Sequence, residues 1–577
     1  MINLEVKNRD KSKSFVKIDN SIEKLQAAKN KWVDLPISDK IEKLKDLNKR
    51  TGEYAQMWVD LSIKHKQIDT NSTLAGEEWS TGPWALISSV NAYIQTLNEL
   101  NNGNISRLIK GIEKRNDGQL KVKVFPSNFY ETLLFNKIQG EVWMQKGVTE
   151  DNILQNMAEL YRRKKPNGKV SLVLGAGNIN SIPPLDVLYN LLVKGEVALL
   201  KMNPVNDYLS PIFEKIFASF IKEDFVKLVN GGIEEGKYLT SHPDIETIHI
   251  TGSEKTHDAI VYGVGEEGLK RKIKNDPILD ASKPIRSELG GIGPMIVVPG
   301  PWNEKDIDFQ SQNIVTAKLH NGGHNCVASQ VLVLPKKWKN SEKLLAKIRK
   351  YLNEIPSRKA YYPGSVNRQR SAMEAYPDSE TLTGELPRIL ITDLDSGNKN
   401  EYAFQTEFFG AIYAETNIDG DTPLEFLQNA VSFCNSSLHG TLGATILIHP
   451  KTIKELGDAL ENCIADLQYG AVGVNVWNGV AFLLPQCTWG AFPGHTYDDI
   501  QSGIGVVHNS LMFDKPEKTV LYGPFRTLPR AFNLAPPKPP WFVTNRTANK
   551  TMRLITKFAL RPSMIKLPGI FYSALKG

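Results

Sequence analysis

The stretch from Lys169 to Pro204, KVSLVLGAGNINSIPPLDVLYNLLVKGEVALLKMNP, joins two strand-like runs through a segment with helical spacing. The first run, "KVSLVLGAGN", is apolar and ends in glycines, and "PPLDVLYNLLVKG" leads from it to the second run, "EVALLKMNP". Strands that alternate with helices predict a parallel sheet with helices on both faces. This stretch therefore predicts an α/β fold.

The same alternation continues downstream. "LSPIFEKIFASFI" has helical spacing, while "FVKLVNGG" and "ETIHITGS" are strand-like and end in glycine-containing turns. Glycines at the strand ends predict a ligand crevice at the carboxyl edge of the sheet. "GAGNIN" lacks the full G-x-G-x-x-G spacing, so by itself it favours a tight turn over a dinucleotide fingerprint.

Composition indicates a soluble globular protein in a reducing compartment. The 577 residues are enough for several domains, with 41% hydrophobic and 23% charged residues. The polar amino terminus does not have the apolar core of a signal peptide, and no apolar run approaches the length of a spanning helix. The four cysteines have neither paired nor metal-type spacing: Cys326, Cys434, Cys463 and Cys487. We therefore expect a cytoplasmic protein.

Positive charge is concentrated at the carboxyl end. Residues 515–577 contain twelve lysines or arginines and one acid, although the whole chain has a net charge of only +7. The proline-rich "LAPPKPPW" within this region resembles a junction between a globular body and an appendage. We interpret 515–577 as a basic C-terminal extension.

One segment of this extension, "TANKTMRLITKFALR", predicts a helix with two different sides. The basic side carries Lys550, Arg553, Lys557 and Arg561, and the apolar side carries Ala548, Met552, Ile555 and Ala559. Basic amphipathic helices are typical of membrane surfaces, and the apolar "LPGIFYSAL" follows. The alternatives are an oligomer arm or a cover for a substrate channel. Nucleic acid is not an expected partner, because the body has no matching basic patch with interleaved aromatic residues.

A candidate nucleophile lies in "HNGGHNCVASQVLVLP", His320 to Pro335. Cys326 follows a glycine pair that allows close backbone approach, and a strand-like run supports it from behind. A thiol with a pKa near 8.5 needs a base to become a nucleophile at neutral pH. Glu288, in "SELGG", is the candidate base. His324 either influences the thiol, lines the substrate path or has a plain hydrogen-bonding role.

These motifs resemble those of the NAD(P)-dependent aldehyde dehydrogenase superfamily, in the family's order over about residues 20–510. "SELGG" and "NGGHNCVAS" resemble its glutamate and cysteine signatures. "GAGNINSIPP" resembles the asparagine motif, and "EVALLKMNP" the cofactor lysine motif 23 positions later. "ITGSEK" and "TEFFGAI" resemble two further cofactor motifs. Mapped onto this chain, the matching positions are Asn178, Lys201, Gly252, Ser253, Glu288, Cys326, Glu407 and Phe409.

The resemblance implies a Rossmann-type cofactor domain plus an α/β catalytic domain, and oxidation of an aldehyde to a carboxylic acid. Cys326 would attack the carbonyl, Asn178 and the Cys326 amide would hold the oxyanion, and Glu288 would activate the hydrolytic water. The remaining positions would hold NAD or NADP: Lys201 and Glu407 at the riboses, Phe409 at the nicotinamide, and Gly252 and Ser253 at the pyrophosphate. No metal is implied.

Three departures from the family pattern affect the cofactor site. Pro204 replaces the carboxylate that NAD-preferring members usually carry three positions after the lysine, which leaves NAD versus NADP open with NAD slightly preferred. His257 stands where glycine is common. The chain between Gly252 and Glu288 is longer than usual, and we expect the insertion in "GEEGLKRKIKNDPILDASKP" to form a loop beside the sheet.

The resulting domain assignment has four parts: 1–290 with N-terminal helices and the dinucleotide-binding domain, 291–480 as the catalytic domain, 481–514 as a return to the cofactor and oligomerisation region, and 515–577 as the extension. A homodimer or homotetramer is expected, with a medium- or long-chain aliphatic aldehyde as a candidate substrate. The alternatives are a CoA-acylating aldehyde dehydrogenase or acyl-CoA reductase, and a catalytically silent scaffold of the same fold.

Overall fold

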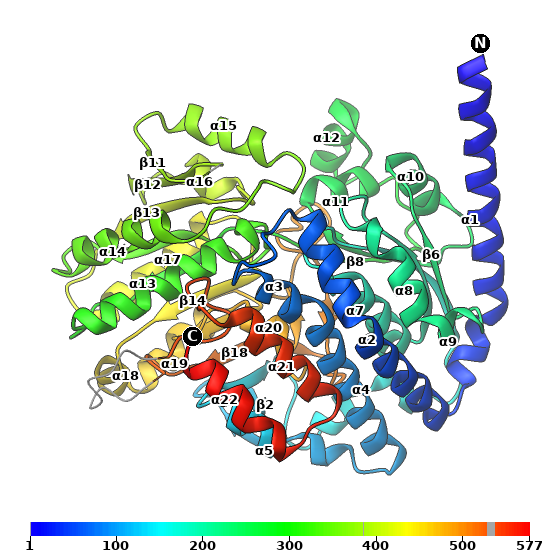
Figure 1. Cartoon of the computed structure of the whole chain (residues 1–577), viewed down its shortest axis with the longest axis horizontal. Helices are drawn as coiled ribbons and strands as arrows, with labels where there is room; N and C mark the ends of the chain where they lie inside the picture. Colours follow the sequence, from blue (N-terminus) through cyan, green and yellow to red (C-terminus); the bar gives the residue numbers. More distant parts are fainter. Residues whose placement is uncertain (1, 385, 528–536) are drawn as a thin grey trace.

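The stretch that predicted the fold forms two neighbouring strands of a five-stranded parallel sheet (Figure 1). The computed structural model describes residues 2–384, 386–527 and 537–577, with side chains from residue 15 onward. The strand order is β6-β5-β4-β7-β8, and all neighbours are parallel. The strands are β4 (Lys169–Leu174), β5 (Glu196–Lys201), β6 (Val226–Val229), β7 (Thr247–Gly252) and β8 (Ile285–Leu289). The predicted alternation of strands and helices is confirmed.

Helices α1 (Ile2–Asp34), α7 (Ile182–Tyr189) and α8 (Ser210–Ile216) pack apolar side chains against this sheet. Trp32 of α1 is fully buried, and its indole donates to the Leu191 carbonyl at 2.8 Å. Because β5 has every side chain buried, helices are needed on both of its faces.

A second sheet of eleven strands forms the other half of the molecule (Figure 1). Its order is β1-β2-β3-β18-β15-β14-β9-β10-β13-β12-β11, with antiparallel pairs among β1, β2, β3 and β18 and between β11 and β12. In chain order the strands are β1 (Gly111–Lys114), β2 (Leu120–Phe125), β3 (Gln139–Met144), β9 (Gly293–Val297), β10 (Ser329–Pro335), β11 (Glu380–Leu382), β12 (Arg388–Leu394), β13 (Ile412–Ile418), β14 (Gly443–Leu447), β15 (Ala471–Val474) and β18 (Pro516–Tyr522). A separate antiparallel pair is formed by β16 (Trp489–Gly490) and β17 (Val506–His508).

This sheet crosses the segment boundaries expected from the sequence. Strands β1 to β3 come from the region assigned with the cofactor domain, and β18 comes from the region assigned to the extension. β18 pairs with β3 on one side and with β15 on the other. The start of the extension is therefore part of the sheet that also holds the strands of 291–480.

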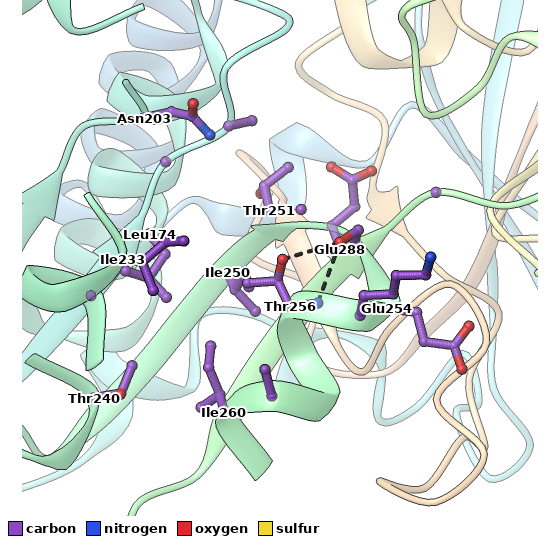
Figure 2. A pocket seen from close by; sticks show the side chains of 18 of the residues that line it. Leu174, Asn203, Ile233, Thr240, Ile250, Thr251, Glu254, Thr256, Ile260 and Glu288 are labelled. Atoms are coloured by element: carbon purple, nitrogen blue, oxygen red, sulfur yellow. Dashed lines mark hydrogen bonds between the residues drawn. The ribbon is translucent and has the colours of Figure 1, made fainter. Parts of the chain in front are cut away.

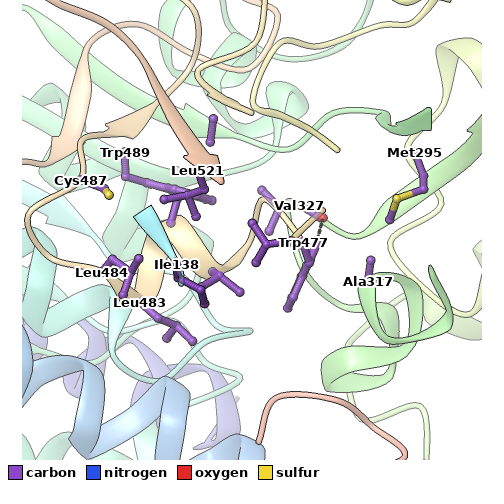
Figure 3. Packing of buried hydrophobic residues seen from close by; sticks show 14 of the residues in the cluster. Ile138, Met295, Ala317, Val327, Trp477, Leu483, Leu484, Cys487, Trp489 and Leu521 are labelled. Carbon is purple, nitrogen blue, oxygen red and sulfur yellow. Dashed lines mark hydrogen bonds between the residues drawn. The ribbon is translucent and has the colours of Figure 1, made fainter. Parts of the chain in front are cut away.

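The candidate nucleophile Cys326 packs against the core beneath the eleven-stranded sheet. Figure 3 shows part of this core around Val327 and Trp477. Trp477 donates its indole N–H to the carbonyl of Val327, the residue after Cys326, at 3.2 Å. Met295 of β9 and Ala317 of the adjoining helix belong to the same buried cluster. The segment around Cys326 is thus supported by a packed, rigid layer.

The other helices cover the sheets or connect strands. They are α2 (Ile37–His65), α3 (Ala75–Trp79), α4 (Ala85–Asn101), α5 (Phe129–Leu134), α6 (Glu159–Arg162), α9 (Ala218–Ile221), α10 (Ile233–Ser241), α11 (Glu254–Val261), α12 (Gly265–Lys274), α13 (Glu304–Leu319), α14 (Ser341–Glu354), α15 (Ser365–Ala375), α16 (Tyr402–Gln405), α17 (Pro423–Ser437), α18 (Pro450–Leu456), α19 (Asp458–Asp466), α20 (Val480–Leu483), α21 (Ala548–Leu560) and α22 (Leu567–Leu575). Within the described residues, none of these helices has both the length and the apolar character needed to cross a membrane.

The predicted C-terminal helix forms as α21, but its apolar side faces the protein. Ala548 and Met552 are buried, and α21 packs along α3 (Figure 1). A Cβ at Gly76 of α3 would come within 2.6 Å of the Ala548 backbone, so glycine is needed for this close approach. The interpretation of this side as membrane-inserting is therefore wrong. The proline-rich junction lies partly outside the described residues, because 528–536 are not described.

Candidate functional site

A cavity of about 1880 Å³ runs along the carboxyl edge of the five-stranded sheet and reaches the second sheet. All eight residues singled out from the sequence line it: Asn178, Lys201, Gly252, Ser253, Glu288, Cys326, Glu407 and Phe409. Figure 2 shows the strand-end residues Leu174, Ile250 and Thr251 around this cavity together with Glu288. The crevice expected at the strand ends is therefore present, and it brings together motifs that are far apart in the chain.

Glu288 and Cys326 lie at the buried end of the cavity, which we call the catalytic end. Glu288 is the second-last residue of β8 and has 1% of its surface exposed, and neither carboxylate oxygen has a hydrogen-bond partner among the described residues. Burial raises the pKa of Glu288 to about 8, and the nearby Cys326 thiol and Trp489 indole oppose this only in part. Burial and the neighbouring Glu288 carboxylate also raise the pKa of Cys326. At neutral pH both groups hold their protons, so forming the thiolate requires a coupled proton transfer.

Asn178 reaches the same end from the turn after β4. Its side-chain amide donates to the His324 carbonyl at 3.0 Å, which leaves the second amide hydrogen for a ligand. Its backbone carbonyl accepts three hydrogen bonds, from Lys66, Asn321 and Tyr361. Contacts on both sides therefore fix the direction of this amide.

The turn that presents Cys326 uses a backbone conformation that favours glycine. Gly322 and Gly323 have φ of 66° and 82°, and Asn321 joins them in the left-handed region at 55°. A Cβ at Gly323 would lie 2.5 Å from the Gly410 carbonyl. The expected close backbone approach at this glycine pair is confirmed.

His324 has a hydrogen-bonding role in this turn. Its Nε2 contacts the Ser365 hydroxyl at 2.7 Å, and its Nδ1 contacts the Asn321 carbonyl at 3.1 Å. Burial lowers the pKa of His324 to about 3, so the ring is neutral at physiological pH. His324 does not line the cavity, although its neighbour Tyr362 does.

The opposite part of the cavity, which we call the cofactor end, is formed by strand ends and a helix start. Lys201 ends β5 and donates to the Gly231 carbonyl at 2.7 Å. Ser253 caps α11 by accepting from the Thr256 amide at 3.3 Å. Glu254 follows, and its hydrogen bond to His439 at 2.8 Å, helped by Lys272, lowers the pKa of Glu254 to about 2.

Glu407 and Phe409 lie between the two ends. Burial raises the pKa of Glu407 to about 7, and its carboxylate lies against Gly290 where no Cβ could fit. Phe409 has φ of 44°, and Arg368 holds it: the guanidinium lies 5.7 Å from the ring centroid and donates to the Phe408 carbonyl at 2.8 Å.

The first half of the insertion expected as a loop is helical, so the expectation is wrong for residues 265–274, while 275–284 form no helix or strand. Residues 265–274 form α12, whose Lys272 bridges Glu254 at 2.9 Å and Asp258 at 2.7 Å. These ion pairs join the insertion to α11 at the cofactor end. His257 is fully buried in α11.

Several contributing side chains have no sequence signature. Lys66, Arg368 and His439 come from three separate parts of the chain, and each contacts a residue of the site. Their positions depend on long-range contacts, so single charged residues of this kind cannot be distinguished in the sequence from ordinary surface charges.

Part of the chain is similar in sequence to known aldehyde dehydrogenases. The aldehyde dehydrogenase family model matches residues 131–378. "Aldehyde dehydrogenase family 3 member A2" of Rattus norvegicus is 22% identical over 296 residues, which cover 49% of this chain and 55% of the relative. The chain thus aligns with about half the length of this curated relative.

Two solved structures share the fold. The NADP-dependent glyceraldehyde-3-phosphate dehydrogenase from Bacillus halodurans C-125, complexed with NADP, has a TM-score of 0.57 at 17% identity, covering 88% of this chain and 90% of that one. The Mycobacterium tuberculosis aldehyde dehydrogenase complexed with NAD+ has a TM-score of 0.55 at 16% identity, covering 90% and 91%. The chain is thus similar to the aldehyde dehydrogenase superfamily, over residues 131–378 in sequence and over most of its length in fold.

Proposed function

We propose that this protein oxidises an aldehyde to a carboxylic acid with NAD or NADP. The observation that carries the proposal is the meeting of Cys326, Glu288 and Asn178 at the buried end of one large cavity. A nucleophile, a base and an amide donor are the groups that such a reaction needs.

The chemistry of the three side chains follows from their surroundings. In the molecules in which Glu288 is ionised, its carboxylate accepts the Cys326 proton, and the thiolate adds to the aldehyde carbon while the Asn178 amide donates to the oxygen. NAD or NADP, when bound, supplies the hydride acceptor for the oxidation. After releasing the first proton to solvent, Glu288 takes a proton from the water that hydrolyses the thioester and passes it to the leaving sulfur of Cys326, which releases the acid and restores the thiol.

The cavity suits a dinucleotide on the chemistry of its own residues. Lys201 and Ser253 lie at its cofactor end, where a ribose and a pyrophosphate would be held at the start of α11. One oxygen of the buried Glu407 has no hydrogen-bond partner among the described residues and can accept from a ribose hydroxyl. NAD is slightly preferred, since no lysine or arginine directly follows Lys201.

The direct test is a screen of aldehydes of graded chain length with NAD and with NADP, which monitors reduced cofactor at 340 nm. We expect turnover with at least one aldehyde, and carboxylic acid formed in equal amount. Formation of an acyl-CoA that depends on added CoA would favour the CoA-acylating alternative. Absence of cofactor reduction with every aldehyde, despite cofactor binding, would favour the silent scaffold.

We also propose that this enzyme is cytoplasmic and contacts an anionic membrane surface through the segment after α21. Met564, Ile565, Tyr572 and Leu575 are 54%, 90%, 60% and 68% exposed. Exposed lysines accompany them, among them Lys566. Apolar side chains with neighbouring cations fit an anionic lipid surface, where each cation contributes about 1 kcal/mol. Such a location would favour medium- or long-chain aldehydes, which partition into membranes.

Point substitutions test this surface better than truncation, because removing α21 would uncover buried side chains of the body. We expect the double variant Ile565→Asp/Leu575→Asp to stop sedimenting with phosphatidylglycerol vesicles and to keep activity on short aldehydes. Ile273→Asp, at a 77% exposed position of α12, is the matched control. If the unaltered protein ignores such vesicles at low salt but the double variant loses a homodimer or homotetramer, the segment is an oligomer arm.

A further inference from the structure

Lys66, at the end of α2, is a buried cation at the back of the catalytic end. Its side chain is 2% exposed and its Nζ lies 2.9 Å from Glu78 Oε1, whose side chain is 1% exposed. The same Nζ donates to the Asn178 carbonyl at 3.0 Å and to Asn321 Oδ1 at 3.3 Å. The three ammonium hydrogens thus have three acceptors, on three separate segments of the chain.

Two of these acceptors belong to the segments that present the reacting groups. Asn178 carries the amide proposed to hold the oxyanion, and Asn321 begins the left-handed turn that leads to Cys326. Asn321 also donates its amide to the Asn178 carbonyl at 3.2 Å and to the His324 carbonyl at 3.0 Å. Lys66 therefore joins the segment that carries the Asn178 amide to the turn that begins at Asn321 and presents Cys326.

Residues next to Lys66 support the same two segments. Glu77 accepts from the Asn321 backbone amide at 3.0 Å and forms an ion pair with Arg358. Tyr361, whose ring lies 5.3 Å from Lys66 Nζ, donates to the Asn178 carbonyl at 3.2 Å. The left-handed backbone of Asn321 is thus held by a buried network on all sides.

We propose that Lys66, paired with Glu78, is a positioning residue that sets the distance between the Asn178 amide and Cys326. This inference rests on the proposed aldehyde oxidation. Lys66 does not line the cavity and touches neither substrate nor cofactor, so it acts through Asn178 and Asn321. A displacement of about 1 Å between the Asn178 amide and the Cys326 thiol would lower kcat by about 10²-fold. This is the effect that we expect when Lys66 is removed.

The test compares Lys66→Met with the double variant Lys66→Met/Glu78→Gln. Lys66→Met leaves the buried Glu78 charge with only two longer contacts, to Asn180 at 3.4 Å and to Arg358 at 3.8 Å, so we expect both the melting temperature and kcat to fall. The double variant removes both charges, so we expect it to regain most of the melting temperature while kcat stays about 10²-fold low. The dissociation constant for NAD, measured by fluorescence quenching, should change less than about two-fold.

Lys518→Met is the matched control. Lys518 is also fully buried and donates to three carbonyls, those of Ile464, Ala465 and Leu467, but it does not line the cavity. We expect Lys518→Met to lower the melting temperature and leave kcat at the wild-type value. A double variant at Lys66 and Glu78 with wild-type kcat, or a kcat that follows the melting temperature across all variants, would overturn the proposal.

A second readout separates this inference from the proposed function. The rate at which iodoacetamide alkylates Cys326, measured by mass spectrometry, requires no aldehyde oxidation. We expect a changed rate in both Lys66 variants and an unchanged rate in Lys518→Met. If the wild-type protein oxidises no aldehyde, the proposed function fails, and the alkylation rates still decide whether Lys66 positions Cys326. Equal rates in all variants would overturn the role of Lys66.

Discussion

Glu288 and Glu254 line the same cavity, yet their carboxyl groups behave in opposite ways. Burial without a close hydrogen-bond partner raises the pKa of Glu288 to about 8 at the catalytic end. Hydrogen bonds from His439 and Lys272 lower the pKa of Glu254 to about 2 at the cofactor end. The catalytic end therefore has a carboxyl group that can exchange a proton near neutral pH, while the cofactor end has one that stays charged.

The strongest test of the catalytic end is Cys326→Ala. We expect kcat to fall by about 10⁴-fold or more, because the nucleophile is removed and no other thiol lines the described cavity. Cofactor binding should be nearly unchanged, since Lys201 and Ser253 lie at the other end. Steady-state turnover and cofactor titration measure both. Appreciable turnover with a good substrate would remove Cys326 from the mechanism.

Glu288→Gln should act on the second half of the reaction. Acylation can proceed when another base accepts the thiol proton, but thioester hydrolysis loses its base. We therefore expect the steady-state kcat to fall by about 10²–10³-fold. A stopped-flow trace should show a burst of reduced cofactor close to one equivalent per Cys326. In the unaltered protein, the hydrolysis rate should rise with pH up to about 8, as Glu288 loses its proton. A burst-free trace with normal turnover would contradict this role.

Pro204→Glu tests the cofactor end. A carboxylate here can accept from the adenosine ribose hydroxyl and repel a 2′-phosphate, which would add about 1.5–3 kcal/mol of preference for NAD. We expect the ratio of kcat/KM for NAD over NADP to rise by about 10–100-fold, from a weak preference in the unaltered protein. Pro204→Gln is the uncharged control. A strong NADP preference in the unaltered protein would show that basic residues elsewhere form a phosphate site.

The smallest expected effect is on stability, where the two glutamates should differ in sign. The raised pKa of Glu288 means that the folded state holds a proton that the unfolded state loses above about pH 4.3, so its contribution to stability falls as pH rises from about 4.3 to 8. The lowered pKa of Glu254 stabilises the folded state above about pH 4.3, and this is lost as pH falls toward 2.

We therefore expect Glu288→Gln to raise the melting temperature at pH 8 and leave it nearly unchanged at pH 4. Glu254→Gln should lower the melting temperature at pH 7. Thermal unfolding across this pH range measures both changes, each on the order of 1–3 °C. The same sign for the two variants at pH 7–8 would show that the two carboxyl environments do not differ as described.

The alternation of strands and helices could be predicted from local sequence because a buried parallel strand needs a run of apolar residues. Apolar runs predicted β4, β5 and β7, and helical spacing of apolar and basic residues predicted α21. The insertion was not recognised as helical. Its α12 has only two large apolar side chains, Leu269 and Ile273, and both are exposed, so its sequence carries too short an apolar stripe to predict a packed helix.

The sequence determined which residues enter the cavity, since Asn178 follows the end of β4, Glu288 lies next to the end of β8, and Cys326 lies in the turn that leads into β10. Only the tertiary structure decided their chemical state. The pKa of Glu288 depends on the exclusion of water and of hydrogen-bond donors by residues that are distant in the chain. Likewise, the apolar side of α21 was visible in the sequence, but the contact with α3 decided that it faces the protein. Burial and long-range pairing arise from packing, which local sequence does not specify.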